Sequence, residues 1–174
     1  MFEAVLVACI SLVCLSIMWF TLRTGISPMP SSPRACQAML KASEQAAEGT
    51  MIDLGSGWGT LVFALARKYP ERRIIGYELS WLPWFYARVC KSIFRLHHVQ
   101  LLRQDFLTAE LPAASSLVCY LFPQGMQALS VKLAQPQYRN MLLVSSTFAL
   151  PNKRPVQTIE LNDLYHSPIY IYQL

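Results

Sequence analysis

Hydrophobic residues are concentrated in one long run at the start of the chain. Residues 2–22 read FEAVLVACISLVCLSIMWFTL, and Glu3 is the one charged residue among them. As a helix rising about 1.5 Å per residue, this run would be roughly 31 Å long, which matches the hydrocarbon core of a bilayer. Its apolar residues lie on all sides of such a helix, which disfavours an amphipathic helix packed on a domain by one face. We therefore predict a transmembrane anchor over residues 1–23.

The charges around this run predict its orientation. No Lys or Arg precedes Arg23, whereas Arg23, Arg34 and Lys41 follow the run. A cleaved signal peptide would begin with a basic region, so an uncleaved anchor is favoured. Basic residues mark the cytoplasmic end of a span, which predicts an outside N-terminus and a cytoplasmic domain. Residues 24–33, rich in Pro and Ser, are expected to be a linker, and residues 34–174 one domain.

Beyond the linker, short apolar runs alternate with amphipathic stretches. The runs predict buried strands, and a period near 3.6 residues predicts helices. We expect strands at residues 50–54, 73–78, 99–105, 116–122 and 141–145, and helices at residues 33–47, 60–69, 81–94 and from the FPQG turn to about residue 134. This alternation is typical of a doubly wound α/β fold with a mostly parallel sheet.

The pattern of hydrophobic and polar residues changes near the end of the chain. No helical period appears beyond Ser146, and residues 157–161 and 168–172 have the composition of two strands with a turn around Asn162 and Asp163. The simplest arrangement is an antiparallel hairpin at the edge of the sheet.

The helix predicted at residues 81–94 carries an apolar stripe. Leu82, Phe85, Val89 and Ile93 recur at intervals of three or four residues, so they share one face. We expect this face to belong to the hydrophobic core and not to contact a ligand.

A glycine-rich turn lies where the first strand ends and a helix begins, in the sequence IDLGSGWGT at residues 52–60. Gly55, Gly57 and Gly59 permit positive φ angles and lack the Cβ atoms that would keep a ligand away from the backbone. A tight turn without a ligand is the alternative interpretation. The turn predicts close approach of a nucleotide-like cofactor.

Two acidic residues follow later strands at the same edge of the sheet. Glu78 ends the second strand about 20 residues beyond the glycine turn, where a carboxylate can bind both hydroxyls of a ribose. Asp105 ends the third strand, where it can accept from an adenine amino group. The alternatives are an exposed strand-end acid for Glu78 and a turn cap for Asp105.

These motifs, IDLGSGWGT, GYELS and QDF, resemble those of class I S-adenosylmethionine-dependent methyltransferases over roughly residues 31–151. The apolar N-terminal run, the SPMPSS stretch and FPQGM make the chain similar, more narrowly, to the small single-span protein-lysine methyltransferases related to the ATP synthase c-subunit lysine methyltransferase. The resemblance implies a Rossmann-like fold, an enzyme with S-adenosyl-L-methionine as cofactor, and a lysine of a membrane or membrane-associated protein as acceptor.

The resemblance also implies roles for individual residues. At the cofactor, Asp53, Gly55, Ser56, Gly57 and Gly59 would hold its methionine part, Glu78 the ribose and Asp105 the adenine. Leu79 and Phe106 complete the predicted cofactor-binding residues. Those on the acceptor side would be Tyr120, Leu121, Phe122, Pro123 and Gln124. Trp58 departs from the small polar or acidic residue usual after GSG, and the DPPY or NPPY signature of many amino-group methyltransferases is replaced by FPQG.

Methyl transfer by in-line displacement needs alignment and exclusion of water more than acid-base chemistry. We therefore assign no catalytic side chain. Aromatic walls would favour the neutral form of an acceptor lysine by desolvation, and the candidates for them are Tyr77, Trp81, Tyr120 and Phe122. His97, His98 and His166 lie outside the motifs and are expected to be surface or packing residues.

Composition limits the cofactors and partners. The five cysteines lack metal-ligand spacing, so we predict no metal site. From Arg23 onward, 15 Lys and Arg face nine of the ten acids, a net charge of +6. This charge indicates either a solvated surface or attraction to an anionic lipid bilayer. Nucleic acid is not expected, because no basic run is interleaved with stacking aromatics.

Two other functions fit the same sequence. A nicotinamide-dependent oxidoreductase shares the glycine turn, but the chain lacks a recognisable substrate domain. A membrane-tethered scaffold without catalysis would keep the fold alone.

Overall fold

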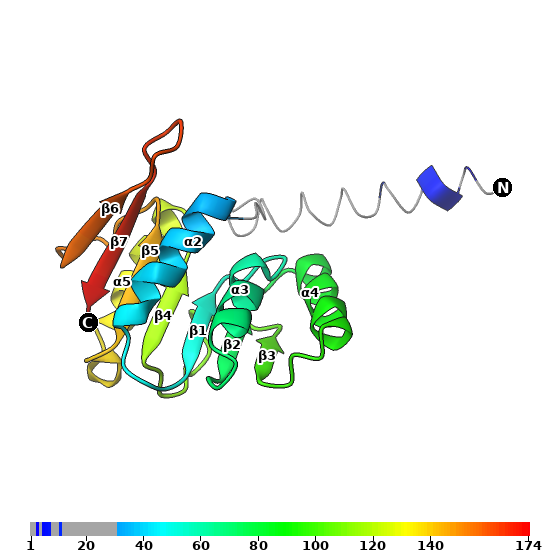
Figure 1. The fold of residues 1–174 in the computed structure, drawn as a ribbon, viewed down its shortest axis with the longest axis horizontal. Helices are drawn as coiled ribbons and strands as arrows, with labels where there is room; N and C mark the ends of the chain where they lie inside the picture. The colour runs from blue at the N-terminus through cyan, green and yellow to red at the C-terminus, as the bar shows by residue number, and fades with distance from the viewer. Residues whose placement is uncertain (1–2, 4, 8–10, 12–30) are drawn as a thin grey trace.

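The computed structural model describes residues 3, 5–7, 11 and 31–174 (Figure 1). The anchor predicted over residues 1–23 and most of the predicted linker therefore lie outside the described residues. Residues 3, 5–7 and 11 are helical and exposed. Within the described parts of the chain, no helix is long and apolar enough to cross a membrane.

A seven-stranded sheet forms the centre of the described domain, in the order β3-β2-β1-β4-β5-β7-β6. The first five strands of this order are parallel, β7 pairs antiparallel with β5, and β6 pairs antiparallel with β7. The strands are β1 (Met51–Leu54), β2 (Ile74–Tyr77), β3 (Val99–Leu102), β4 (Ser116–Cys119), β5 (Leu142–Ser146), β6 (Gln157–Glu160) and β7 (Pro168–Gln173). The predicted mostly parallel sheet with an antiparallel end is confirmed.

The terminal hairpin meets the sheet through its second strand. β7 lies between β5 and β6, and its Ile169, Ile171 and Tyr172 are fully buried, whereas β6 is largely exposed. Apolar burial explains this order, because the strand with more side chains to bury takes the inner position. The predicted hairpin is confirmed, with β6 as the edge strand.

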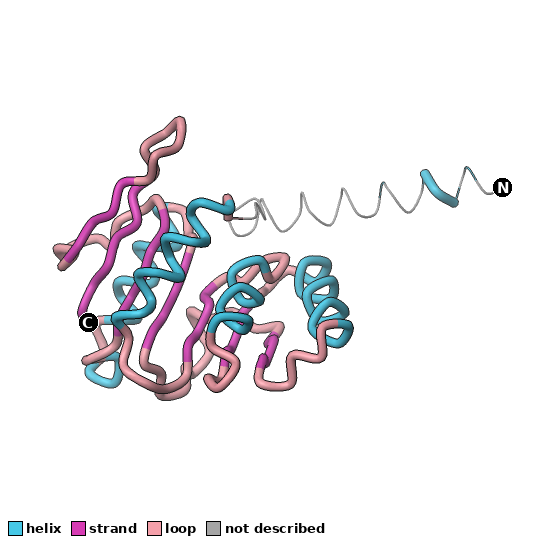
Figure 2. Tube along the Cα trace, in the orientation of Figure 1, coloured by secondary structure: helices cyan, strands magenta, loops and turns pink. Residues whose placement is uncertain are grey.

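Helices cover both faces of the sheet (Figures 1 and 2). Two separate clusters of buried side chains lie beneath them: one includes side chains of α2, α3 and α4, and the other includes those of α5. The helices are α2 (Pro33–Ala42), α3 (Thr60–Lys68), α4 (Trp81–Ile93) and α5 (Pro123–Leu133), with 3-10 turns at Ser43–Gln45 and Pro136–Tyr138.

The first of these helices begins where the sequence predicts and ends early. Ser32 caps α2 by accepting from the backbone N–H of Ala35 at 3.2 Å, and Pro33 is its first residue. The sequence predicts a helix to residue 47, but the α-helical part ends at Ala42. There Ser43 donates its hydroxyl to the carbonyl of Met39 at 2.8 Å, and the chain continues as a 3-10 turn.

The apolar stripe of α4 does not enter the core, so that prediction is wrong. Phe85, Val89 and Ile93 are 48%, 42% and 69% exposed, whereas the buried residues of the helix are Pro83 and Ala87. The helix packs closely through these small residues. Helical spacing shows that apolar residues share a face, but it does not show which way the face points.

Candidate functional site

The glycine turn joins β1 to α3 and is fastened to the neighbouring strand. The backbone N–H groups of Gly55 and Ser56 both donate to the carbonyl of Tyr77, at 2.9 and 2.8 Å. Ser56 is buried, and its hydroxyl has no hydrogen-bond partner among the residues described. The turn therefore lies at the carboxyl edge of the sheet, where open α/β folds bind their ligands.

Gly57 and Gly59 serve the turn in different ways. Both have positive φ angles, 51° and 86°. A Cβ on Gly59 would lie 2.6 Å from Cε2 of Phe63, so its glycine is required by the packing of α3. A Cβ on Gly57 would meet no described atom within 4 Å, so open space lies beside this backbone. That space is where the sequence predicts close approach of a cofactor.

The carboxylate of Glu78 is hydrogen-bonded to the glycine turn. Its Oε2 accepts from the N–H of Gly57 at 2.8 Å, and its Oε1 accepts from the N–H of Ser80 at 2.6 Å. The residue is only 9% exposed, which rules out the alternative of an exposed strand-end acid. Each carboxylate oxygen has a second lone pair, so the group retains the capacity to accept from a diol.

Asp53 lies buried near the same turn, with 3% of its surface exposed. Burial, together with the nearby charge of Glu78, raises the pKa of its carboxyl to about 8, although a hydrogen bond from the backbone of Val62 acts in the opposite direction. A cation placed at this turn would favour the ionised form. Two carboxyl groups beside open backbone thus suit a ligand that carries both a positive charge and a diol.

The third strand brings Asp105 to the same edge, three residues beyond the end of β3. Its Oδ1 accepts from the N–H of Leu107 at 2.9 Å, so the residue caps its own turn. Leu79 and Phe106 are half-buried beside Glu78 and Asp105 in the chain. The adenine role of Asp105 stays a prediction next to this observed capping role.

An aromatic cluster stands at the ends of β4 and β5. The rings of Tyr120 and Phe122 are 6.4 Å apart, and Phe148 lies 6.4 Å from the first and 5.4 Å from the second. Leu121 is buried between them in the chain, and its Cδ2 lies 3.2 Å from where a Cβ on Gly55 would be. The cluster therefore includes two of the predicted acceptor-side aromatics.

Pro123 and Gln124 are exposed in the first turn of α5, for which Phe122 is the N-cap residue. The FPQG sequence is thus a strand-to-helix junction. Proline at the first helical position explains its local form, since the missing N–H costs nothing there.

Phe148 was not among the predicted residues. Thr147 adopts a positive φ of 68° directly after β5, and the hydroxyl of Ser145 donates to the carbonyl of Phe148 at 2.7 Å. This turn directs Phe148 to Tyr120 and Phe122. The local sequence does not predict such a turn, because Thr rarely adopts a positive φ.

Two of the aromatic residues predicted as walls of the acceptor pocket lie away from the aromatic cluster. Tyr77 is 2% exposed within the core, where burial raises its pKa. Trp81 is 49% exposed on α4, with its ring 5.0 Å from Phe85 and 5.8 Å from Trp84. Tyr77 is packed in the sheet and Trp81 lies on the outside of α4, so neither joins the aromatic cluster of Tyr120, Phe122 and Phe148. Their role as walls of the acceptor pocket stays a prediction.

The Cys119 thiol and the three histidines are not assigned catalytic roles. Burial raises the pKa of the Cys119 thiol to about 12, so it stays protonated and inert at neutral pH. His97 and His166 are exposed, and a ring nitrogen of His98 lies 3.2 Å from the carbonyl of Ala66, as expected of surface or packing residues. In the described part of the chain, no three His, Cys, Asp or Glu side chains gather in a way that could hold a metal ion.

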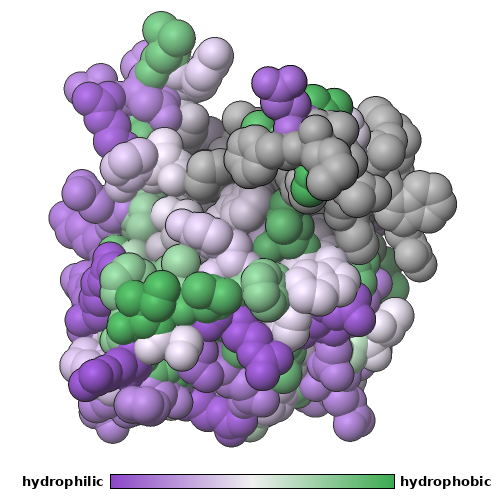
Figure 3. Space-filling view, turned by 90° about the vertical axis from the view of Figure 1, so that its right-hand side faces the viewer, coloured by the Kyte–Doolittle hydropathy of each residue, from purple (hydrophilic) through white to green (hydrophobic). Residues whose placement is uncertain are grey.

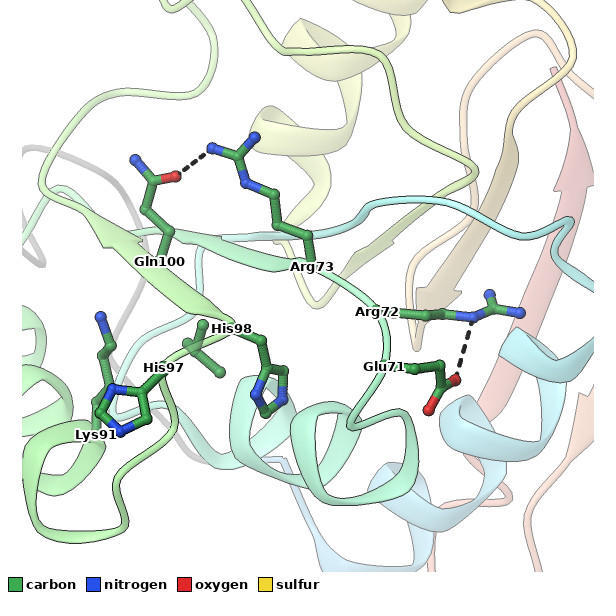
Figure 4. A pocket seen from close by; sticks show the side chains of 8 residues that line it. Glu71, Arg72, Arg73, Lys91, His97, His98 and Gln100 are labelled. Atoms are coloured by element: carbon green, nitrogen blue, oxygen red, sulfur yellow. Dashed lines mark hydrogen bonds and ion pairs between the residues drawn. The ribbon is translucent and has the colours of Figure 1, made fainter.

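A basic hollow of about 490 Å³ lies at the opposite edge of the sheet, where β2 and β3 begin (Figure 4). Arg73 donates to Gln100 there at 2.6 Å, and Arg72 faces Glu71 at 3.9 Å. The lining residues are Glu71, Arg72, Arg73, Lys91, His97, His98, Val99 and Gln100. The hollow is separate from the glycine turn.

Comparison with solved structures identifies the fold. The chain is similar to an RNA methyltransferase from Salinibacter ruber in complex with S-adenosyl-L-homocysteine, with a TM-score of 0.73 and 25% identity over 83% of this chain and 92% of that one. It also resembles PKMT2 from Rickettsia typhi in complex with AdoHcy, with a TM-score of 0.52 and 18% identity over 69% of this chain and 25% of that one. The second likeness concerns the fold alone.

Comparison of sequences identifies the family. The profile of the ANTKMT methyltransferase domain matches residues 53–157. The ATP synthase c-subunit lysine N-methyltransferase of Xenopus laevis is 29% identical over 62% of this chain and 47% of that protein. The adenine nucleotide translocase lysine N-methyltransferase of Mus musculus is 32% identical over 64% and 48%. The chain spans about half the length of these relatives. With more than half of its residues matched by the profile, it belongs to the ANTKMT methyltransferase domain family, whose cofactor is S-adenosylmethionine.

Proposed function

We propose that this domain methylates a lysine of a membrane or membrane-associated protein, with S-adenosylmethionine as the methyl donor. The observation that carries the proposal is the position of the Glu78 carboxylate. It accepts hydrogen bonds from the N–H groups of Gly57 and Ser80 and lies close to the buried Asp53. Two relatives, each matched over about half of its length, are named as lysine methyltransferases, one of an ATP synthase component and one of the adenine nucleotide translocase. Their names, with the apolar run at residues 2–22, suggest the acceptor class.

The chain's own residues would hold the cofactor at the glycine turn. Bound S-adenosylmethionine supplies a methyl group on a positively charged sulfur. The open backbone at Gly57 admits the ligand, Glu78 accepts from the ribose hydroxyls, and Asp53 offers a negative charge to the cationic methionine part. Asp105 would bind the adenine amino group beside its capping role.

The aromatic cluster would prepare the acceptor. A lysine ammonium placed against Tyr120, Phe122 and Phe148 loses hydration, which lowers its pKa and favours the neutral amine that can attack. The released proton passes to water, and no side chain is assigned as a base. The domain's contribution is therefore alignment and exclusion of water.

Membrane anchoring would raise the local concentration of such acceptors. The apolar run at residues 2–22 supports an anchor with the N-terminus outside and the domain in the cytoplasm. A tethered enzyme meets membrane proteins as if they were at a high effective concentration.

RNA is a second candidate acceptor, favoured by the likeness to the Salinibacter ruber enzyme. The two acceptors separate in a transfer assay with a radiolabelled methyl group, run on membrane protein fractions and on RNA in parallel. Label that enters lysine supports the proposal, whereas label that enters RNA alone overturns its acceptor class.

The cofactor site is tested by calorimetric titration of S-adenosylmethionine, S-adenosylhomocysteine and NAD into the detergent-solubilised full chain. We expect selective binding of the first two. Glu78→Ala removes two charge-assisted contacts of the turn and should weaken binding by about 10- to 100-fold. Glu160→Ala, at an exposed acid on β6, is the matched control and should bind normally.

Three outcomes of the titration and of the transfer assay together would count against the proposal. Unchanged affinity in Glu78→Ala would remove Glu78 from the pocket. Preference for NAD would favour the oxidoreductase, and cofactor binding without any methyl transfer would favour the scaffold.

A further inference from the structure

The outer face of α4 is apolar where a surface helix is normally polar. The term outer face of α4 denotes Trp81, Phe85, Tyr86, Val89 and Ile93, which are between 42% and 69% exposed. Apart from Phe94, the C-cap residue of α4, the other described large hydrophobic side chains on the domain surface are scattered singly or in a pair, at Val131, Val156, Leu164 and Tyr165. A contiguous exposed apolar patch of this kind marks a contact surface.

The outer face of α4 is not needed to pack the helix on the domain. The helix already packs through Pro83 and Ala87, and Trp84 donates its ring N–H to the carbonyl of Leu101 at 3.3 Å. Figure 3, which looks onto the side of the molecule where α4 lies, shows a band of hydrophobic side chains bordered by hydrophilic ones. The helix is thus apolar on the side turned away from the sheet.

The segment around α4 is also uniformly basic. No acidic residue occurs between Glu78 and Asp105, whereas this stretch contains four Lys and Arg: Arg88, Lys91, Arg95 and Arg103. The guanidinium of Arg88 lies 5.2 Å from the ring of Trp84, and Lys91 lines the basic hollow. Basic groups therefore border the apolar face without any acid of the same segment to neutralise them.

We propose that the outer face of α4 lies on an anionic lipid bilayer. Trp and Tyr favour the interfacial zone of a membrane, aliphatic and Phe side chains favour the acyl region, and Lys and Arg favour anionic headgroups. All three classes occur on this one helix. The aliphatic part of the stripe, Val89 and Ile93, offers no stacking surface for bases, which argues against single-stranded RNA as its occupant.

The orientation would bring the cofactor turn to the membrane. α4 begins three residues after Glu78, whose carboxylate accepts from the N–H of Ser80, the N-cap residue of this helix, so the N-terminal end of the face adjoins the site. The ring of Trp58, within the glycine turn, contacts that of Tyr86 edge-on at 5.4 Å. A lipid-bound α4 would hold the mouth of the site at the bilayer surface, and Trp58 would couple the turn to the helix.

The test places a photoreactive side chain on the face in the full chain, reconstituted in vesicles that contain phosphatidylglycerol. The variant is Phe85→p-benzoylphenylalanine, and the matched control is Tyr165→p-benzoylphenylalanine, at an 84% exposed position between β6 and β7. Mass spectrometry after irradiation identifies what each probe contacts. We expect lipid adducts at position 85 and severalfold fewer at position 165.

Charge provides a second readout. With the probe at position 85, Arg88→Gln and Arg95→Gln should each lower the yield of lipid adducts by about fivefold in anionic vesicles. In phosphatidylcholine vesicles the two changes should have little effect. Equal yields in both lipids with and without the arginines would contradict the electrostatic part of the proposal.

The other occupants of the face appear as different adducts. Cross-links from position 85 to residues 2–22 of the same chain, to a second copy, or to RNA added to the vesicles would each overturn the proposal. Equal lipid labelling at positions 85 and 165 would do the same. None of these results depends on methyl transfer, so failure here leaves the proposed function standing.

Discussion

Helices α3 and α4 follow neighbouring strands, lie on the same face of the sheet and both carry an apolar stripe, yet they use it in opposite ways. In α3 the stripe is buried and includes Leu61, Val62 and Leu65. In α4 it is exposed, and small residues make the contact with the domain. The difference teaches that a helical period identifies a face, whereas the neighbouring elements decide where that face points. α3 follows a central strand, and α4 packs against β3 at the edge of the sheet.

Truncation of one residue from each stripe should show this difference as stability. Leu65→Ala removes a fully buried side chain and should lower the free energy of unfolding by about 2–5 kcal/mol. Val89→Ala, on the outer face of α4, should change it by no more than about 0.5 kcal/mol. Urea denaturation of the detergent-solubilised proteins measures both, and similar losses would mean that the stripe of α4 is buried after all.

The glycine turn, where the two helices approach each other, should be the next most sensitive point. A Cβ on Gly59 would meet Phe63 of α3 at 2.6 Å and Ala87 of α4 at 3.2 Å, at a φ of 86°. Gly59→Ala should therefore cost about 2–4 kcal/mol from backbone strain and overpacking together. Thermal unfolding measures the loss.

Gly57→Ala is the matched comparison within the same turn. It faces open space and should cost only the left-handed backbone strain of about 1–2 kcal/mol. Its main effect should be weaker binding of S-adenosylmethionine, because the new methyl group occupies the path to the backbone. Normal affinity in Gly57→Ala together with a stable Gly59→Ala would contradict the division of roles between the two glycines.

The last expected effect is a pH dependence that arises at Asp53 of β1. The folded pKa of Asp53 is raised to about 8, from an ordinary value near 4, so the folded state binds more protons between these values. The contribution of Asp53 to stability therefore falls as pH rises from about 4 to about 8. A bound cation favours the ionised form, so affinity for S-adenosylmethionine should rise by up to about tenfold per pH unit below pH 8.

Calorimetry in buffers of different ionisation enthalpy measures the protons released on binding. Asp53→Asn should abolish the release that belongs to this carboxyl and leave any contribution from the amino group of the cofactor. An unchanged proton release in the variant would show that Asp53 does not respond to the ligand.

The sheet and the cofactor turn were predictable because their signals are local. Short, mainly apolar runs identify β1, β2 and β4, since a strand buried on both faces is predominantly apolar. Positive φ at Gly57 follows from glycine itself. Glu78 could be placed beside the turn because parallel strands end at one edge.

The features that were missed depend on contacts distant in sequence. Phe148 joins the aromatic cluster through a turn at Thr147 that no turn-forming residue marks. Tyr77 and Trp81 have the same aromatic character as Tyr120 and Phe122, and only the packing of the sheet and of α4 separates them. A side chain's chemistry was readable from the sequence, but its surroundings were not.

By itself, the sequence determined the family, the order of strands and helices along the chain, and the glycine turn with Glu78 beside it, because each of these depends on neighbours within a few residues or on a motif. The tertiary structure alone decided that β7 lies between β5 and β6 in the sheet, that the ring of Phe148 packs near those of Tyr120 and Phe122, and that α4 exposes its apolar face. Burial is a property of the whole assembly of elements, since the free energy of removing apolar surface from water depends on which element covers which.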